Sequence, residues 1–95
     1  MPSIGVLTLE INVPEAHSLK EKRHVVRGLK DRLRSRFNVS VAEIDGQDSW
    51  QRAVVAAVTV SGDHDRALAI LQSVEDEAAN ILGGMLVSSG VEWIE

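Results

Sequence analysis

The segment from Ala53 to Val58 is apolar at every position, and this run constrains the fold more than any other feature of the chain. A strand with one solvated face alternates apolar and polar residues. A continuous apolar run instead indicates a strand that is covered on both faces or lies in the middle of a sheet. We therefore expect a central strand from Gln51 to about Ser61.

A second central strand is predicted from Ile4 to Val13, because apolar and polar side chains alternate there. Its core-facing side would carry Leu7, Leu9, Ile11 and Val13. Two further strands are expected, at Phe37 to Ile44, which ends at the turn signal Asp45-Gly46, and at about Met85 to Ile94. Gly90 is a candidate bulge within the last strand.

Two amphipathic helices separate these strands. Ser18 and Glu21 have the spacing of a capping box, so the first helix should begin near Leu19. Asp63 can cap the second helix, and Gly83-Gly84 should end it.

The resulting order, βαββαβ, predicts an α+β fold of the ferredoxin-like type: a four-stranded antiparallel sheet of order 4-1-3-2 with both helices on one face. A chain of 95 residues suits one such domain, spanning residues 1–95. The face without helices would then expose apolar side chains, and such a face often forms a contact between subunits. We expect a homo-oligomer through a face that carries Ile4, Val6, Val54, Ala56 and Val58.

Charge is distributed unevenly along the chain. The segment from Lys20 to Arg36 holds eight of the ten Lys and Arg residues and only two acids, which gives +6 within a chain of net charge −4. On a helix, most of these cations fall on one arc, apart from the apolar arc. The first helix should therefore present a cationic side.

Three motifs occur in a fixed order: Ser18-Leu-Lys-Glu-Lys-Arg23, Arg36-Phe-Asn-Val-Ser-Val-Ala-Glu43 and Gln47-Asp-Ser-Trp-Gln-Arg52. In these motifs the chain resembles the YlxP-like family of short bacterial proteins of unknown function. The resemblance covers nearly the whole chain and implies a ferredoxin-like domain without assigned catalytic residues. Genes of this family often lie near genes for translation initiation and ribosome maturation, which implies a connection with ribosomal RNA.

The leading functional hypothesis is a non-enzymatic module that binds ribosomal or other structured RNA through the first helix and nearby cations. A competing interpretation leaves the basic side solvated or paired with the acidic second helix. Two further hypotheses are a homo-oligomeric domain that recruits an acidic protein and a regulatory domain that binds a small molecule. The candidate contacts are Lys20, Arg23, Arg27, Lys30, Arg34, Arg36 and Arg52.

The aromatic residues limit how RNA could bind. Reading of single strands by a sheet face requires aromatic side chains on central strands, and Phe37, Trp50 and Trp93 all lie elsewhere. Trp50 falls in a polar loop between two strands, where it would either contact a partner or fold over the end of the sheet.

Other classes of function find little support in the sequence. The chain has no cysteine, its three histidines lack metal-ligand spacing, and it contains no nucleotide-binding loop or nucleophile motif. We expect no cofactor, no metal, no element that reads DNA sequence and no membrane span, and an enzymatic role ranks last. The absence of cysteine and of a visible secretory signal favours the cytoplasm.

Overall fold

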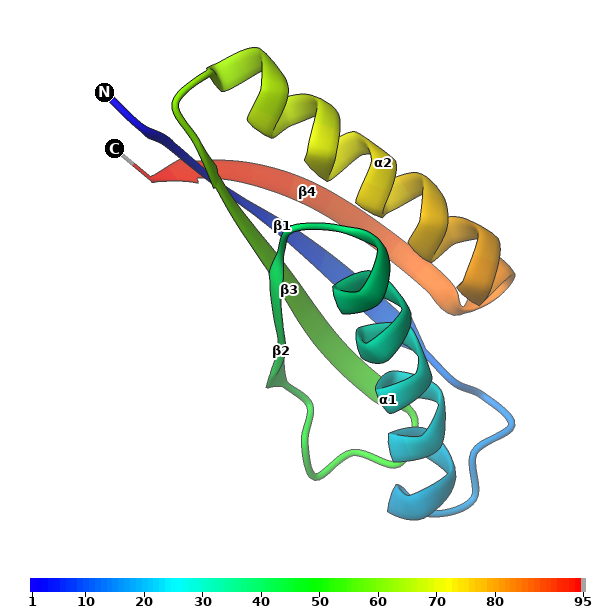
Figure 1. The fold of residues 1–95 in the computed structure, drawn as a ribbon. Helices are drawn as coiled ribbons and strands as arrows, with labels where there is room; N and C mark the ends of the chain where they lie inside the picture. Colours follow the sequence, from blue (N-terminus) through cyan, green and yellow to red (C-terminus); the bar gives the residue numbers. More distant parts are fainter. Residues whose placement is uncertain (95) are drawn as a thin grey trace.

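The computed structural model describes residues 1–94 and has the expected order of elements. The sheet order is β2-β3-β1-β4, every neighbouring pair is antiparallel, and α1 and α2 lie together on one face (Figure 1). The predicted ferredoxin-like fold is therefore confirmed. The elements are β1 (Ser3–Asn12), α1 (Leu19–Arg36), β2 (Ser40–Asp45), β3 (Arg52–Ser61), α2 (His64–Leu82), a 3₁₀ turn (Gly83–Met85) and β4 (Leu86–Ile94).

The core lies between the sheet and the two helices. Alternate residues of β1 and β3 supply its floor, and the apolar stripes of α1 and α2 close it. Both helix starts are as predicted: Ser18 accepts a hydrogen bond from the Glu21 N–H, and Asp63 accepts one from the Asp65 N–H. The fully buried side chains include Leu7, Leu9, Ile11, Leu29, Leu33, Val55, Leu71 and Val74.

Two boundaries differ from the sequence prediction. β2 begins at Ser40 rather than Phe37, because the Phe37 N–H still donates to the Leu33 carbonyl and caps the end of α1. In β4 the bulge is not at Gly90, which pairs regularly with Thr8. The register shifts instead near Val87, where β1 passes from Glu10 to Ile11.

The apolar side chains on the face of the sheet opposite the helices are only partly exposed. Ile4, Val6 and Val58 are half-buried, whereas Val54 and Ala56 are buried, at 9% and 7% exposure. Two of the five residues predicted for the oligomer face are therefore already buried within one chain, and the role of this face as a contact stays a prediction. Within residues 1–94, neither long helix combines the length and apolarity that crossing a bilayer requires.

Candidate functional site

α1 divides its cations between a free side and an occupied side. Four of the seven predicted contacts make no ion pair or side-chain hydrogen bond with any residue in the 1–94 range. They follow one another at intervals of three and four residues, so they share one side of the helix. Lys30 is half-buried and the others are exposed. We call this group the basic stripe: Lys20, Arg23, Arg27 and Lys30.

Two shallow hollows run along the basic stripe. The first lies at the start of α1, where Ser18, Glu21 and His24 complete its wall beside three cations of the stripe. The second lies between α1 and β2, where Glu43 is the acidic residue opposite Arg23, Arg27 and Lys30. The stripe therefore borders two shallow hollows, each of which also contains one carboxylate.

The other three predicted cations are already engaged. Arg34 donates to the Val41 carbonyl at 3.0 Å and lies 3.5 Å from Asp31. Arg36 turns toward α2 and pairs with Glu77 at 2.8 Å, as Arg32 does at 3.4 Å. The competing interpretation, in which cations of α1 pair with the acidic second helix, therefore holds for this side of α1. Arg36 lies outside the basic stripe.

Arg52 also lies apart from the basic stripe. It starts β3, on the face of the sheet opposite the helices, and pairs with Asp45 at 3.4 Å and Glu10 at 3.7 Å. Together with Thr8, Ser88 and Val54 these residues line a shallow hollow on that face.

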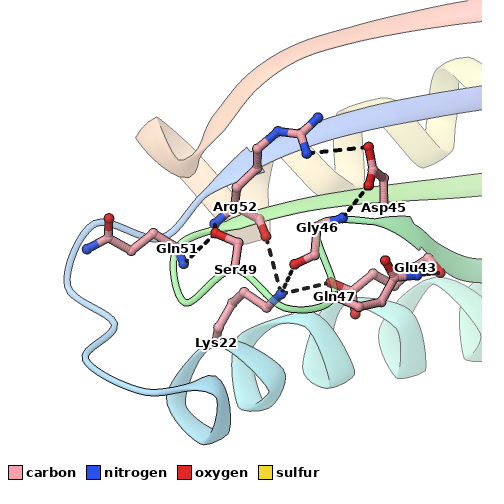
Figure 2. Close-up of polar contacts among 8 residues, drawn as sticks. All are labelled: Lys22, Glu43, Asp45, Gly46, Gln47, Ser49, Gln51 and Arg52. Atoms are coloured by element: carbon pink, nitrogen blue, oxygen red, sulfur yellow. Dashed lines mark hydrogen bonds and ion pairs between the residues drawn. The ribbon is translucent and has the colours of Figure 1, made fainter.

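The sequence prediction missed Lys22, whose side chain is fully buried. Figure 2 shows it reaching from α1 to the loop between β2 and β3. Its Nζ donates to the Gly46 carbonyl at 2.6 Å, to the Arg52 carbonyl at 3.2 Å and to Glu43 Oε2 at 3.1 Å. Lys22 shares the apolar side of the helix with Val26, Leu29 and Leu33, and a lone cation on that arc is the signal that could have revealed it.

Local hydrogen bonds hold the same loop from the other side. Gly46 has φ of +80°, and its N–H donates to Asp45 Oδ1 at 2.8 Å. This bond and the nearby Arg52 guanidinium lower the pKa of the Asp45 carboxyl. The Ser49 hydroxyl accepts from the N–H groups of Gln51 and Arg52. The loop of residues 46–51 is therefore fixed by polar contacts rather than by a hydrophobic core.

Trp50 extends from this fixed loop into solvent, with 57% of its surface exposed. It does not fold over the end of the sheet. Trp93, by contrast, packs against His64 with ring centroids 4.1 Å apart, and it covers Gly5. Across residues 1–94, no three His, Cys, Asp or Glu side chains gather in a way that could hold a metal ion.

Comparison with known proteins identifies the family of this chain. Residues 4–89 match the family described as "Protein of unknown function (DUF503)". The chain belongs to the DUF503 family. A relative, the uncharacterized protein YlxP of Bacillus subtilis, is 39% identical over 71 residues, which cover 75% of this chain and 77% of the relative. The predicted YlxP-like resemblance is confirmed.

Solved structures with low sequence identity share the fold of this DUF503 chain. The de novo designed protein Foldit4 aligns with a TM-score of 0.61 at 8% identity, covering 100% of this chain and 98% of the designed one. A dimeric ferredoxin-like protein of unknown function from Thermobifida fusca aligns with a TM-score of 0.51 at 16% identity, covering 98% and 90%. At such identities the likeness shows the fold alone.

Proposed function

We propose that this DUF503 protein is a non-enzymatic module that binds structured RNA, and ribosomal RNA in particular, through the basic stripe. The observation that supports this proposal most is the absence of any neutralising partner for Lys20, Arg23, Arg27 and Lys30 within residues 1–94. Cations that stabilised the fold would be expected to pair, as Arg32 and Arg36 do.

The geometry of the basic stripe suits a phosphate backbone. Ten residues of helix separate its first and last members, which corresponds to about 15 Å at a rise of ~1.5 Å per residue. A line of four cations over this length can meet several phosphates, and the counterions that leave those phosphates favour binding. Because the whole chain carries a net charge of −4, RNA should bind only in the orientation that faces the stripe.

The proposal is tested by measuring RNA affinity against salt concentration. A fluorescein-labelled hairpin of ribosomal RNA is titrated with the wild type and with the double variant Arg23→Gln/Arg27→Gln, and binding is followed by fluorescence anisotropy. If two phosphate contacts are lost, the slope of log K against log salt should become shallower by about 1.4 to 1.8.

A matched control removes the same charge from the other side of α1. The variant Arg32→Gln/Arg36→Gln loses two cations that already pair with Glu77, so it should bind the hairpin almost as the wild type does. Equal losses in the two variants would show a response to net charge only and would contradict the proposal. Absence of binding by the wild type would contradict it as well.

A sedimentation experiment addresses the ribosomal and cytoplasmic parts of the proposal. The tagged protein, recovered from its own cells at low salt, should move with a ribosomal subunit in a sucrose gradient and leave it when salt is added. Nuclease treatment should release it. An association that survives nuclease would point instead to an acidic protein as the partner of the basic stripe.

A further inference from the structure

The two edges of the sheet differ sharply in how they are protected. β4 forms one edge, and every residue from Val87 to Glu92 is exposed. Its only charged side chain is Glu92, the strand contains no lysine, arginine or proline, and its bulge lies near Val87, at the start of the strand. Natural proteins usually protect an exposed edge with such residues, because unpaired backbone N–H and C=O groups can bind another strand.

β2, at the opposite edge, is unsuited to pairing with a second copy. Arg34 occupies the carbonyl oxygen of Val41, so one main-chain acceptor of this strand is already in use. The basic stripe lies next to the strand, where Arg23, Arg27 and Lys30 share a hollow with Glu43. Two β2 edges brought together would place these cations close to those of the other copy.

We propose that two copies of the chain associate antiparallel through β4 and form one continuous eight-stranded sheet. This inference does not rest on RNA binding. The partner is a second copy because the β4 sequence is complementary to itself. In a register centred on Gly90, Ser88 lies opposite Glu92 of the other copy, and Ser89 lies opposite Val91. The two Glu92 carboxylates are thereby kept apart. The regular pairing ends at Ser88, because the register of β4 shifts near Val87.

The exposed apolar side chains support this edge as the contact. Val87 is 60% exposed and Ile94 is 55% exposed, so both would lose solvent contact beside a second β4. On the face opposite the helices, Val54 and Ala56 are already buried, and the Arg52–Glu10 pair would have to be desolvated. Stacking through that face would therefore bury less additional apolar surface.

Pairing through β4 also fixes the arrangement of the helices. The two-fold axis of an antiparallel strand pair that continues a sheet is perpendicular to the sheet. All four helices would then lie on one side, with the two α2 helices near the centre and the two α1 helices farther out (Figure 1). Both basic stripes would belong to the same side of the dimer.

The test uses opposite charges at the centre of the proposed register. A Cβ on Gly90 meets nothing within 4 Å, so Gly90→Lys and Gly90→Glu should both fold, as circular dichroism would verify. Each variant places like charges opposite each other, and each should dimerise about fivefold or more weakly than the wild type in analytical ultracentrifugation. An equimolar mixture of the two should recover association, because a mixed dimer pairs lysine with glutamate.

A second variant distinguishes the edge from the face of the sheet. Val60 lies on the face opposite the helices and is 58% exposed, so Val60→Lys should leave a β4 dimer intact but prevent face-to-face stacking. Loss of the dimer in Val60→Lys would overturn the proposal in favour of the face. A wild type that stays monomeric at high micromolar concentration would overturn it outright, as would Gly90 variants that dimerise like the wild type.

Discussion

A Cβ atom on Gly46 would lie 2.6 Å from the carbonyl oxygen of Arg52, closer than real side chains approach a backbone atom. The same glycine has φ of +80°, a conformation that side-chain-bearing residues rarely adopt. Turn geometry and close approach thus both require glycine where the chain leaves β2. The loop that carries Trp50 begins at this glycine.

The variant Gly46→Ala should therefore unfold more easily than the wild type. We expect a loss of about 1 to 3 kcal/mol in the free energy of unfolding, because strain in the backbone adds to the clash with Arg52. Urea denaturation followed by circular dichroism measures it. A loss below about 0.5 kcal/mol would mean that the loop rearranges freely.

Gly28→Ala is the matched control and should have the opposite sign. Gly28 lies within α1, and a Cβ there meets nothing within 4 Å. Alanine reduces the freedom of the unfolded chain, so the free energy of unfolding should rise by about 0.5 to 1 kcal/mol. A destabilised Gly28→Ala variant would show that this position has a contact that the structure does not reveal.

Replacement of Lys22 by methionine tests the connection between α1 and the loop. Methionine keeps most of the buried volume but donates no hydrogen bond, so Glu43 and the carbonyls of Gly46 and Arg52 each lose one donor, and Gly46 keeps the Ser49 N–H. We expect a loss of about 2 to 4 kcal/mol in unfolding free energy, and faster amide exchange in residues 46–51. Arg32→Met, at a position 55% exposed, should lose less than about 1 kcal/mol. Equal losses would show that the buried hydrogen bonds of Lys22 stabilise the fold no more than an exposed ion pair does.

Stability should depend on Asp45 in acid. The Gly46 N–H and Arg52 favour the ionised carboxyl in the folded state, so its folded pKa lies below its unfolded value of about 3.9. The stabilisation is present above that value and is lost as pH falls through the folded pKa. Asp45→Asn should therefore lower the urea midpoint at pH 7, and the difference should shrink toward pH 3. A difference that stays constant would exclude ionisation as its cause.

Trp50 should contribute to RNA binding if its loop contacts the same partner as the basic stripe. Exposed aromatic rings stack with unpaired bases, and removal of one such contact costs about 1 to 3 kcal/mol of binding energy. Trp50→Ala should weaken binding of a hairpin with an unpaired loop by about fivefold or more, while unfolding free energy stays near the wild-type value. Unchanged affinity would restrict the contact to α1.

The sequence predicted the fold well because each periodicity maps onto one local conformation. The alternation in Ile4–Val13 and the apolar run Ala53–Val58 together placed β1 and β3 at the centre of the sheet, as observed. The start of β2 was less predictable, because the β-branched residues after Phe37 do not reveal that Phe37 caps α1.

The site was predictable only in part. Helical spacing identified the cations of the basic stripe, but it could not show that Arg36 reaches Glu77 on a helix 41 residues away in sequence. The role of Lys22 was equally hidden, since its three partners lie 21 to 30 residues further along the chain. Contacts of this kind depend on tertiary packing rather than on local pattern.

Each N–H bond of the Lys22 ammonium group has an acceptor of its own. The group carries three N–H bonds, and the fold offers three oxygens, one each from Glu43, Gly46 and Arg52. An apolar pair could replace the charges of Lys22 and Glu43 in an otherwise similar core, but the Arg52 carbonyl would lose the Lys22 donor and the Gly46 carbonyl would keep only the Ser49 N–H. The loop backbone, more than the carboxylate, therefore dictates which residue type can occupy position 22, and α1 and the Trp50 loop are constrained to change together.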